Sequence, residues 1–147
     1  MKRDFPLRIP FVEHLGLELW GFGDGKAELR VDLQESHLNS WEVAHGGVLM
    51  TLLDVAMAHA ARASSSSDPM TAPGVATIEM KTTFMRPAEG ELRALGHLMH
   101  RTSTMAFCEG RVLDGHGELC AHATATFKYL RALPSRGRTL KNLQEKT

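Results

Sequence analysis

One carboxylate lies in the middle of the longest apolar segment of the chain. Asp54 falls within a proline-free run, rich in Ala, Leu and Met, that predicts a helix from Gly46 to about Ala63. No cation lies three or four positions away, where the neighbours are Met50, Thr51, Met57 and Ala58. An unpaired carboxylate among apolar groups costs free energy. Two interpretations stay open: Asp54 bonds to Thr51, another strand or water, or it serves as a general base or nucleophile.

A histidine and two glycines occupy the start of the same predicted helix. The run His45-Gly46-Gly47 leaves the first backbone N–H groups open to close approach, and the helix dipole adds positive potential there. Such a site could stabilise the oxygen of a polarised carbonyl without any catalytic side chain. The alternative is a glycine-rich helix entry that binds nothing, with His45 as a structural hydrogen-bonding group.

The distance between these two features limits how they can cooperate. Eight helical residues, at a rise of about 1.5 Å each, separate Asp54 from the helix start by about 12 Å. A carbonyl held at Gly46 and a water activated by Asp54 must approach to about 3–3.5 Å. One chain cannot satisfy both conditions, whereas two chains with antiparallel central helices could. If Asp54 is catalytic, we therefore expect at least a dimer with shared active sites.

The rest of the chain supplies strands that must position this helix. Apolar periodicity, with turn signals at 23–25 and 114–117, predicts a short helix and six strands. The expected ranges are 9–15 for the short helix and 16–22, 27–33, 74–85, 90–100, 104–113 and 118–129 for the strands. These elements pack most simply as an α+β fold in which an antiparallel sheet curls around the long helix. Such a sheet leaves an edge strand that two copies can pair.

Strict alternation also assigns side chains to the two faces of each strand. It places Cys120 and His122 together on the polar face of the last strand, and His97 and His100 on opposite faces of theirs. Neither pair makes a metal site, so we expect no metal. With no CxxC motif, Cys108 and Cys120 indicate a reducing compartment rather than a disulfide framework.

Length and charge narrow the class of protein further. A chain of 147 residues predicts one domain over 1–147, with its core at 9–130. The balance of 17 Lys+Arg against 17 Asp+Glu argues against a nucleic-acid binder. The segment 131–147 is basic, and we expect a mobile, solvated tail, with contact to a polyanion as the alternative. The chain shows no signal peptide and no apolar run of the roughly 20 residues that cross a bilayer, so we expect a cytoplasmic protein.

A resemblance to a known family rests on the spacing of these residues. The pattern Asn39-x5-His45-Gly46-Gly47-x5-Leu53-Asp54-x-Ala56 resembles the signature of hotdog-fold acyl-CoA thioesterases. It is most similar to the PaaI-like, phenylacetate-pathway branch of the hydroxybenzoyl-CoA thioesterase superfamily. The resemblance covers about residues 9–130 and includes the run 84–88, Phe-Met-Arg-Pro-Ala, and the segment 117–127. It implies a single hotdog fold and an acyl-CoA thioesterase that forms a homodimer or a dimer of dimers.

Carried over residue by residue, the resemblance implies roles for five positions. The Gly46 amide would polarise the thioester carbonyl, and Asp54 of the other subunit would activate water or attack directly. Asn39 and His45 would help hold the substrate end of the pocket. Thr77 is the nearest match to a hydroxyl residue that positions the water in relatives. By alternation Thr77 falls on the polar face of its strand, so this role requires a shift of one residue.

The coenzyme A end of such a substrate carries phosphates, which should meet cations at the mouth of the pocket. Arg86 and Arg101 are the candidates, although each could instead be a solvated turn residue, and Gly47 completes the expected substrate-binding group. Relatives often carry Gly where Glu42 stands. The added carboxylate bears on the conformation of this loop and on the preferred charge of the substrate.

Two classes of function fit these residues. The first is a thioester hydrolase that needs no cofactor, since coenzyme A is part of the substrate. The second is a non-catalytic acyl-CoA-binding or regulatory protein on the same fold. Methionines adapt to varied shapes, so both aryl and medium-chain alkyl groups remain open as the acyl part. Those expected near the pocket are Met50, Met57, Met80 and Met85.

Overall fold

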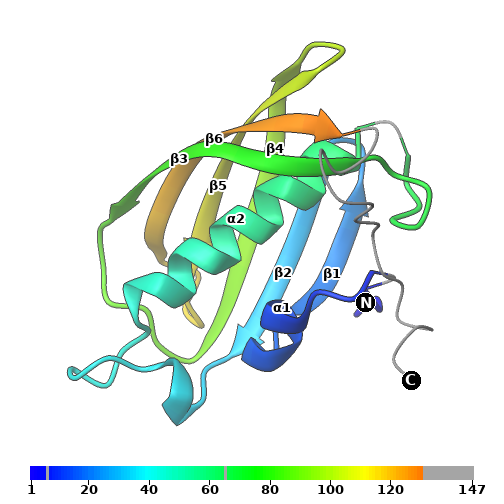
Figure 1. Cartoon of the computed structure of the whole chain (residues 1–147). Helices are drawn as coiled ribbons and strands as arrows, with labels where there is room; N and C mark the ends of the chain where they lie inside the picture. The colour runs from blue at the N-terminus through cyan, green and yellow to red at the C-terminus, as the bar shows by residue number, and fades with distance from the viewer. Residues whose placement is uncertain (6, 65, 131–147) are drawn as a thin grey trace.

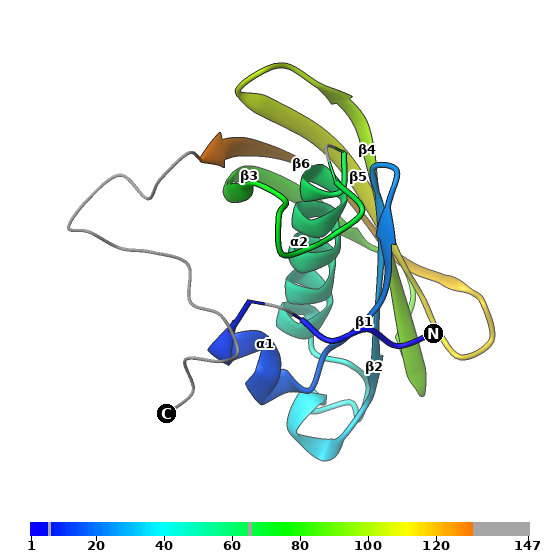
Figure 2. The same cartoon turned by 90° about the vertical axis from the view of Figure 1, so that its right-hand side faces the viewer.

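A six-stranded antiparallel sheet curls around one long helix in the computed structural model of the chain, which describes residues 1–5, 7–64 and 66–130. The elements are α1 (Pro10–Leu15), β1 (Glu18–Gly23), β2 (Lys26–Asp32), the 3-10 turn η1 (Glu35–His37), α2 (Gly46–Arg62), β3 (Gly74–Phe84), β4 (Glu91–Arg101), β5 (Met105–Leu113) and β6 (Leu119–Leu130). Figure 1 shows α2 lying across the sheet, and Figure 2 shows the sheet bending around it. The predicted α+β hotdog architecture is confirmed, and the tail 131–147 lies outside the described residues.

The order of the strands is β1-β2-β4-β5-β6-β3, so β1 and β3 form the two edges of the sheet. The edge at β1 is bridged at one point, where Arg3 N–H donates to Leu19 O at 2.6 Å. Within the described residues, β3 pairs with β6 alone and keeps its other edge unpaired. The expected free edge strand is therefore present, and it is the strand that follows α2.

The ends of α2 are fixed by side chains. His45, in an extended conformation at the N-cap, accepts a hydrogen bond from Gly47 N–H at 2.9 Å. At the other end the buried Arg62 guanidinium donates to the carbonyl oxygens of Pro69 and Pro73, which holds the following loop against the helix. The first bond satisfies a backbone N–H in the first turn of the helix, and the other two satisfy the buried guanidinium. No described helix is long and apolar enough to span a membrane.

The sheet covers only one side of α2. Gly96 of β4 allows so close an approach that a Cβ at this position would lie 2.3 Å from Ala56 O. On the opposite side of the helix lies a band of partly exposed residues, called the open stripe below: Gly46, Gly47, Met50, Thr51, Asp54 and Ala58. Apolar residues nearly encircle α2, a pattern that is typical of a buried helix, but within a single chain the open stripe is partly exposed. Met57 is part of the core rather than of a pocket.

A β-bulge buries Cys120. Val112 pairs with Ala121 whereas Leu113 pairs with Leu119, so Cys120 is an extra residue with no direct partner. Its side chain joins the hydrophobic core. The predicted position of Cys120 on the polar face is therefore wrong, because a bulge inserts one residue and shifts the alternation of side chains.

A second bulge changes the faces of two histidines in β4. The register shifts between Leu98 and His100, so His97 lies opposite Glu109 and His100 lies opposite Phe107. Glu109 and Phe107 flank the buried Cys108 and both point away from α2. His97 and His100 consequently share the outer face, contrary to the prediction that they lie on opposite faces.

Candidate active site

The carboxylate of Asp54 lies on the open stripe and is held from β3. Thr77 Oγ1 donates a hydrogen bond to Asp54 Oδ1 at 2.7 Å. Asp54 is half-buried and Thr77 is exposed, so solvent can reach the carboxylate. Among the described residues, no group bonds to Asp54 Oδ2. A bond to another strand is thus present, and it orients the carboxylate while leaving one oxygen available.

A bulge in β3 brings Thr77 to the helix side. The register shifts between Thr77 and Glu79, which leaves Ile78 as the extra residue. Thr77 therefore faces α2, while Met80, three positions later, also packs inward against the core. The predicted outward position of Thr77 is wrong, and the bulge supplies the one-residue shift that its role requires.

The start of α2 presents one free backbone donor. Gly47 N–H donates to His45 Nδ1, and a Cβ at Gly47 would lie only 3.1 Å from that nitrogen. Within the part of the chain that is described, Gly46 N–H has no hydrogen-bond acceptor. The dipole of α2 adds positive potential at this amide. His45 and Gly47 therefore form the cap, and Gly46 is the donor left open.

A buried histidine that sequence reasoning missed anchors this cap. His37 accepts Gln34 N–H at Nδ1 and bonds through Nε2 to Leu15 O at 2.7 Å. Its own carbonyl oxygen accepts His45 N–H at 2.8 Å. Gln34 and His37 have the spacing of a capping box, and this spacing is the sequence signal that could have revealed the structural role of His37.

Asn39 organises the loop before the helix. Its Oδ1 accepts the N–H groups of Trp41 at 2.8 Å and Val43 at 3.4 Å, and its carbonyl oxygen accepts Glu42 N–H at 3.0 Å. Glu42 has φ of 61°, the left-handed conformation that glycine adopts most easily. The loop thus accommodates Glu42 in a glycine-like conformation, with its carboxylate exposed.

The structure does not bring Gly46 and Asp54 together within one chain. α2 runs without interruption from Gly46 to Arg62, so the eight-residue separation corresponds to about 12 Å along the axis. The roles predicted for Asn39, His45, Gly46, Asp54 and Thr77 stay predictions. Three of these residues lie at or before the helix start, whereas Asp54, in the middle of the open stripe, is paired with Thr77 of β3.

The two candidate arginines lie near opposite ends of α2. Arg86, two residues after β3, forms an ion pair with Glu118. Arg101 is the last residue of β4 rather than a turn residue. Its guanidinium lies 4.0 Å from the centroid of the Tyr129 ring and donates a hydrogen bond to Oγ of Ser64, a residue that follows α2. Both side chains are therefore engaged within the chain, and their contact with coenzyme A stays a prediction.

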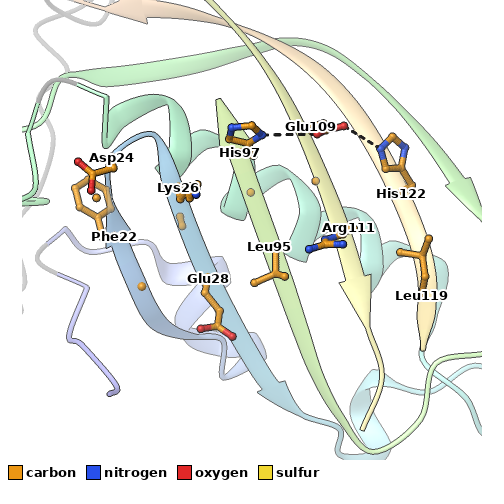
Figure 3. A pocket seen from close by; sticks show the side chains of 15 residues that line it. Phe22, Asp24, Lys26, Glu28, Leu95, His97, Glu109, Arg111, Leu119 and His122 are labelled. Atoms are coloured by element: carbon orange, nitrogen blue, oxygen red, sulfur yellow. Dashed lines mark hydrogen bonds and ion pairs between the residues drawn. The ribbon is translucent and has the colours of Figure 1, made fainter. Parts of the chain in front are cut away.

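A hollow of about 920 Å³ lies on the outer face of the sheet, away from α2. Figure 3 shows Glu109 between two histidines of neighbouring strands, with His97 Nδ1 at 3.7 Å from one carboxylate oxygen and His122 Nε2 at 3.4 Å from the other. Neither Asp54 nor Thr77 lines this hollow. Across the residues that are described, no three His, Cys, Asp or Glu side chains could hold a metal ion. The hollow is thus separate from the open stripe.

His59 and Arg62, near the C-terminal end of α2, are buried titratable groups that lie outside this candidate site. Burial, and secondly the positive charge of Arg62, lower the pKa of His59 to about 4, while the hydrogen bond to Val55 O acts in the opposite direction. Burial also lowers the pKa of Arg62. The His59 ring packs edge-on against Phe5 and Phe22. These contacts fix the C-terminal part of α2.

Comparisons with known proteins identify the family. A sequence profile described as "Thioesterase superfamily" matches residues 42–121. A protein of Halobacterium salinarum with a provisional esterase name is 34% identical over 101 residues, which cover 67% of this chain and 66% of that protein.

Solved structures of similar proteins support the same family. The conserved protein PA5202 of Pseudomonas aeruginosa is 31% identical, with a TM-score of 0.77 over 85% of this chain and 97% of that one. A variant of the phenylacetic acid degradation protein PaaI from Thermus thermophilus is 26% identical, with a TM-score of 0.71 over 83% of this chain and 100% of that one. The chain therefore belongs to the thioesterase superfamily and has the hotdog fold.

Proposed function

We propose that the protein is an acyl-CoA thioesterase in which two subunits build each active site. Gly46 N–H of one subunit polarises the thioester carbonyl, and Asp54 of the partner subunit activates the attacking water. The observation that carries this proposal is the Thr77–Asp54 hydrogen bond on an uncovered helix face of a thioesterase-superfamily chain.

The hydrogen bond prepares the carboxylate for proton transfer. Because Thr77 occupies Oδ1, Oδ2 of Asp54 is left to take a proton from water as its oxygen attacks the carbonyl carbon. The negative charge that develops on the carbonyl oxygen meets Gly46 N–H at the positive end of α2. Collapse of the tetrahedral intermediate breaks the C–S bond; the thiolate of coenzyme A takes the proton, and the acid leaves. Water is the only co-substrate.

Two surfaces of the chain favour a homodimer, and a dimer of dimers extends the same arrangement. The free edge of β3 offers unpaired backbone groups, and the open stripe lies beside it. Gly46 and Asp54 are each four residues from Met50, which is 39% exposed. Antiparallel α2 helices that meet at Met50 about a twofold axis would therefore set each Gly46 opposite the Asp54 of the other subunit.

Replacing the carboxylate without changing its shape tests the chemical role. We expect Asp54→Asn to lower kcat for acyl-CoA hydrolysis by about 100-fold or more, as loss of a general base does. Thiol release from a panel of acyl-CoAs measures the rate. A fully active Asp54→Asn enzyme would reject the proposal. Thermal stabilisation by acyl-CoA with no turnover by the unaltered protein would favour the non-catalytic alternative.

Mixing two inactive proteins tests whether the site is shared. Gly46→Pro removes the backbone donor at the first helical position, which tolerates proline, and the extended His45 suits a following proline. Co-expressed Gly46→Pro and Asp54→Asn subunits should give hybrid dimers with one intact site of two. Random pairing predicts about a quarter of the unaltered activity. No recovery in verified hybrids would place both groups in the same subunit's site.

A further inference from the structure

The ring of Phe84 lies beside the free amide of Gly46. A Cβ built on Gly46 would meet Phe84 Cε1 at 3.4 Å and Cζ at 3.6 Å. Phe84 is the last residue of β3 and pairs with Ala121, a small residue of β6. This orientation of Phe84 follows from the bulge in β3, after which alternate residues from Met80 to Phe84 point toward α2. The edge of the ring thus lies within van der Waals contact distance of a Cβ at Gly46.

One side of this ring has no partner among the residues that the structure describes. Phe84 is 50% exposed although its edge is packed on the helix start. Met85, the next residue, is equally exposed, and Met50 lies one helical turn after Gly46 on the open stripe. The backbone here is fixed, because Met85 N–H donates to Cys120 O at 2.8 Å. A half-exposed aromatic ring on a fixed backbone, beside an unpaired donor, is an arrangement that suits an apolar group attached to a carbonyl.

We propose that Phe84 determines acyl specificity: its ring is the wall against which the acyl chain that follows the thioester carbonyl packs. This inference rests on the proposed function, since the carbonyl is taken to bind Gly46 N–H. Thioesters with an apolar acyl group of several carbons gain contact with the ring, whereas an acetyl group reaches little of it.

The test compares a long with a short acyl group. We expect Phe84→Ala to lower the ratio of kcat/KM for hexanoyl-CoA over acetyl-CoA by about tenfold, in the range of one or two lost methylene contacts. Phe84→Leu should keep most of the ratio because it keeps an apolar wall. The matched control is Phe107→Ala, which removes a 36% exposed ring from the outer face of the sheet. The control should leave the ratio unchanged.

A binding measurement separates this inference from the proposed chemistry. S-hexyl-coenzyme A, a thioether that cannot be hydrolysed, should bind Asp54→Asn more tightly than coenzyme A does, and adding Phe84→Ala should reduce that preference about tenfold. Circular dichroism and thermal unfolding verify that each variant is folded. An unchanged preference and an unchanged kcat/KM ratio in Phe84→Ala would overturn the role of Phe84. Activity that survives Asp54→Asn would overturn only the chemistry.

Discussion

The two sides of α2 differ in what their residues touch. Toward the sheet, Ala56 and Met57 are fully buried, and Gly96 lets the helix backbone approach the strand. On the open stripe, Asp54 is partly exposed to solvent, and its one side-chain partner among the described residues is Thr77. The same helix thus holds the fold together on one side and leaves reactive groups uncovered on the other. Changes on the sheet side should cost stability, and changes on the open side should cost activity.

The largest effect on stability should come from Gly96→Ala. The added Cβ would lie 2.3 Å from Ala56 O and 2.9 Å from Met57 N, both backbone atoms that cannot move without shifting the helix. We expect a loss of about 3 kcal/mol or more in the free energy of unfolding, measured by urea denaturation. The control Gly21→Ala, whose Cβ would lie 3.4 Å from Glu28 Cβ, should change it by less than about 1 kcal/mol. Equal stabilities would mean that α2 does not approach β4 this closely.

Acid should weaken the sheet side through His59. Its pKa is about 4 in the folded protein and about 6.5 when exposed, so between these values the unfolded chain binds a proton that the folded chain does not. The contribution of neutral His59 to stability is therefore fully present above pH 6.5 and is lost as the pH falls toward 4. The contribution is about 3 kcal/mol. Urea denaturation of the unaltered protein and of His59→Leu at several pH values isolates it as the difference between the two curves. Parallel curves would contradict the low pKa.

Sequence periodicity predicted the elements well but failed at the bulges. The helix start follows from Gly46-Gly47 after a capping residue, and the hairpin follows from Asp24-Gly25, because short-range chemistry decides both. The strand faces predicted for Thr77 and Cys120 were wrong. A bulge inserts one residue and reverses the alternation, and its position depends on pairing with a distant strand.

The open side of α2 was beyond sequence reasoning for another reason. Ala58 and Met50 are as apolar as Ala56 and Met57, so the pattern predicts burial all round without saying what covers each side. Only the curvature of the sheet decides which residues it reaches. The spacing of Asp54 from Gly46 did predict that one chain cannot bring them together, because helical rise is fixed.

On the open side, Thr77→Val should cost activity and little stability. The hydrogen bond to Asp54 is solvent-exposed, so its loss should change the free energy of unfolding by at most about 1 kcal/mol. A carboxylate no longer oriented should lower kcat by roughly tenfold, with KM little changed. Thr77→Ser keeps the hydroxyl and should restore most of kcat. A Thr77→Val enzyme with full kcat would show that this bond does not prepare Asp54.

The smallest expected effect is the slow chemical labelling of the two cysteines on the sheet side of α2. Burial raises the pKa of Cys108 to about 12, so almost no Cys108 thiolate exists at pH 8, and burial also raises the pKa of Cys120, which disfavours its thiolate. Ellman's reagent should therefore label neither thiol in the folded protein within minutes and both in urea. Rapid labelling of Cys120 alone would mean that the bulge in β6 exposes the side chain. Because both thiols lie behind α2, slow labelling also reports that the sheet side stays closed while the open side exchanges with solvent.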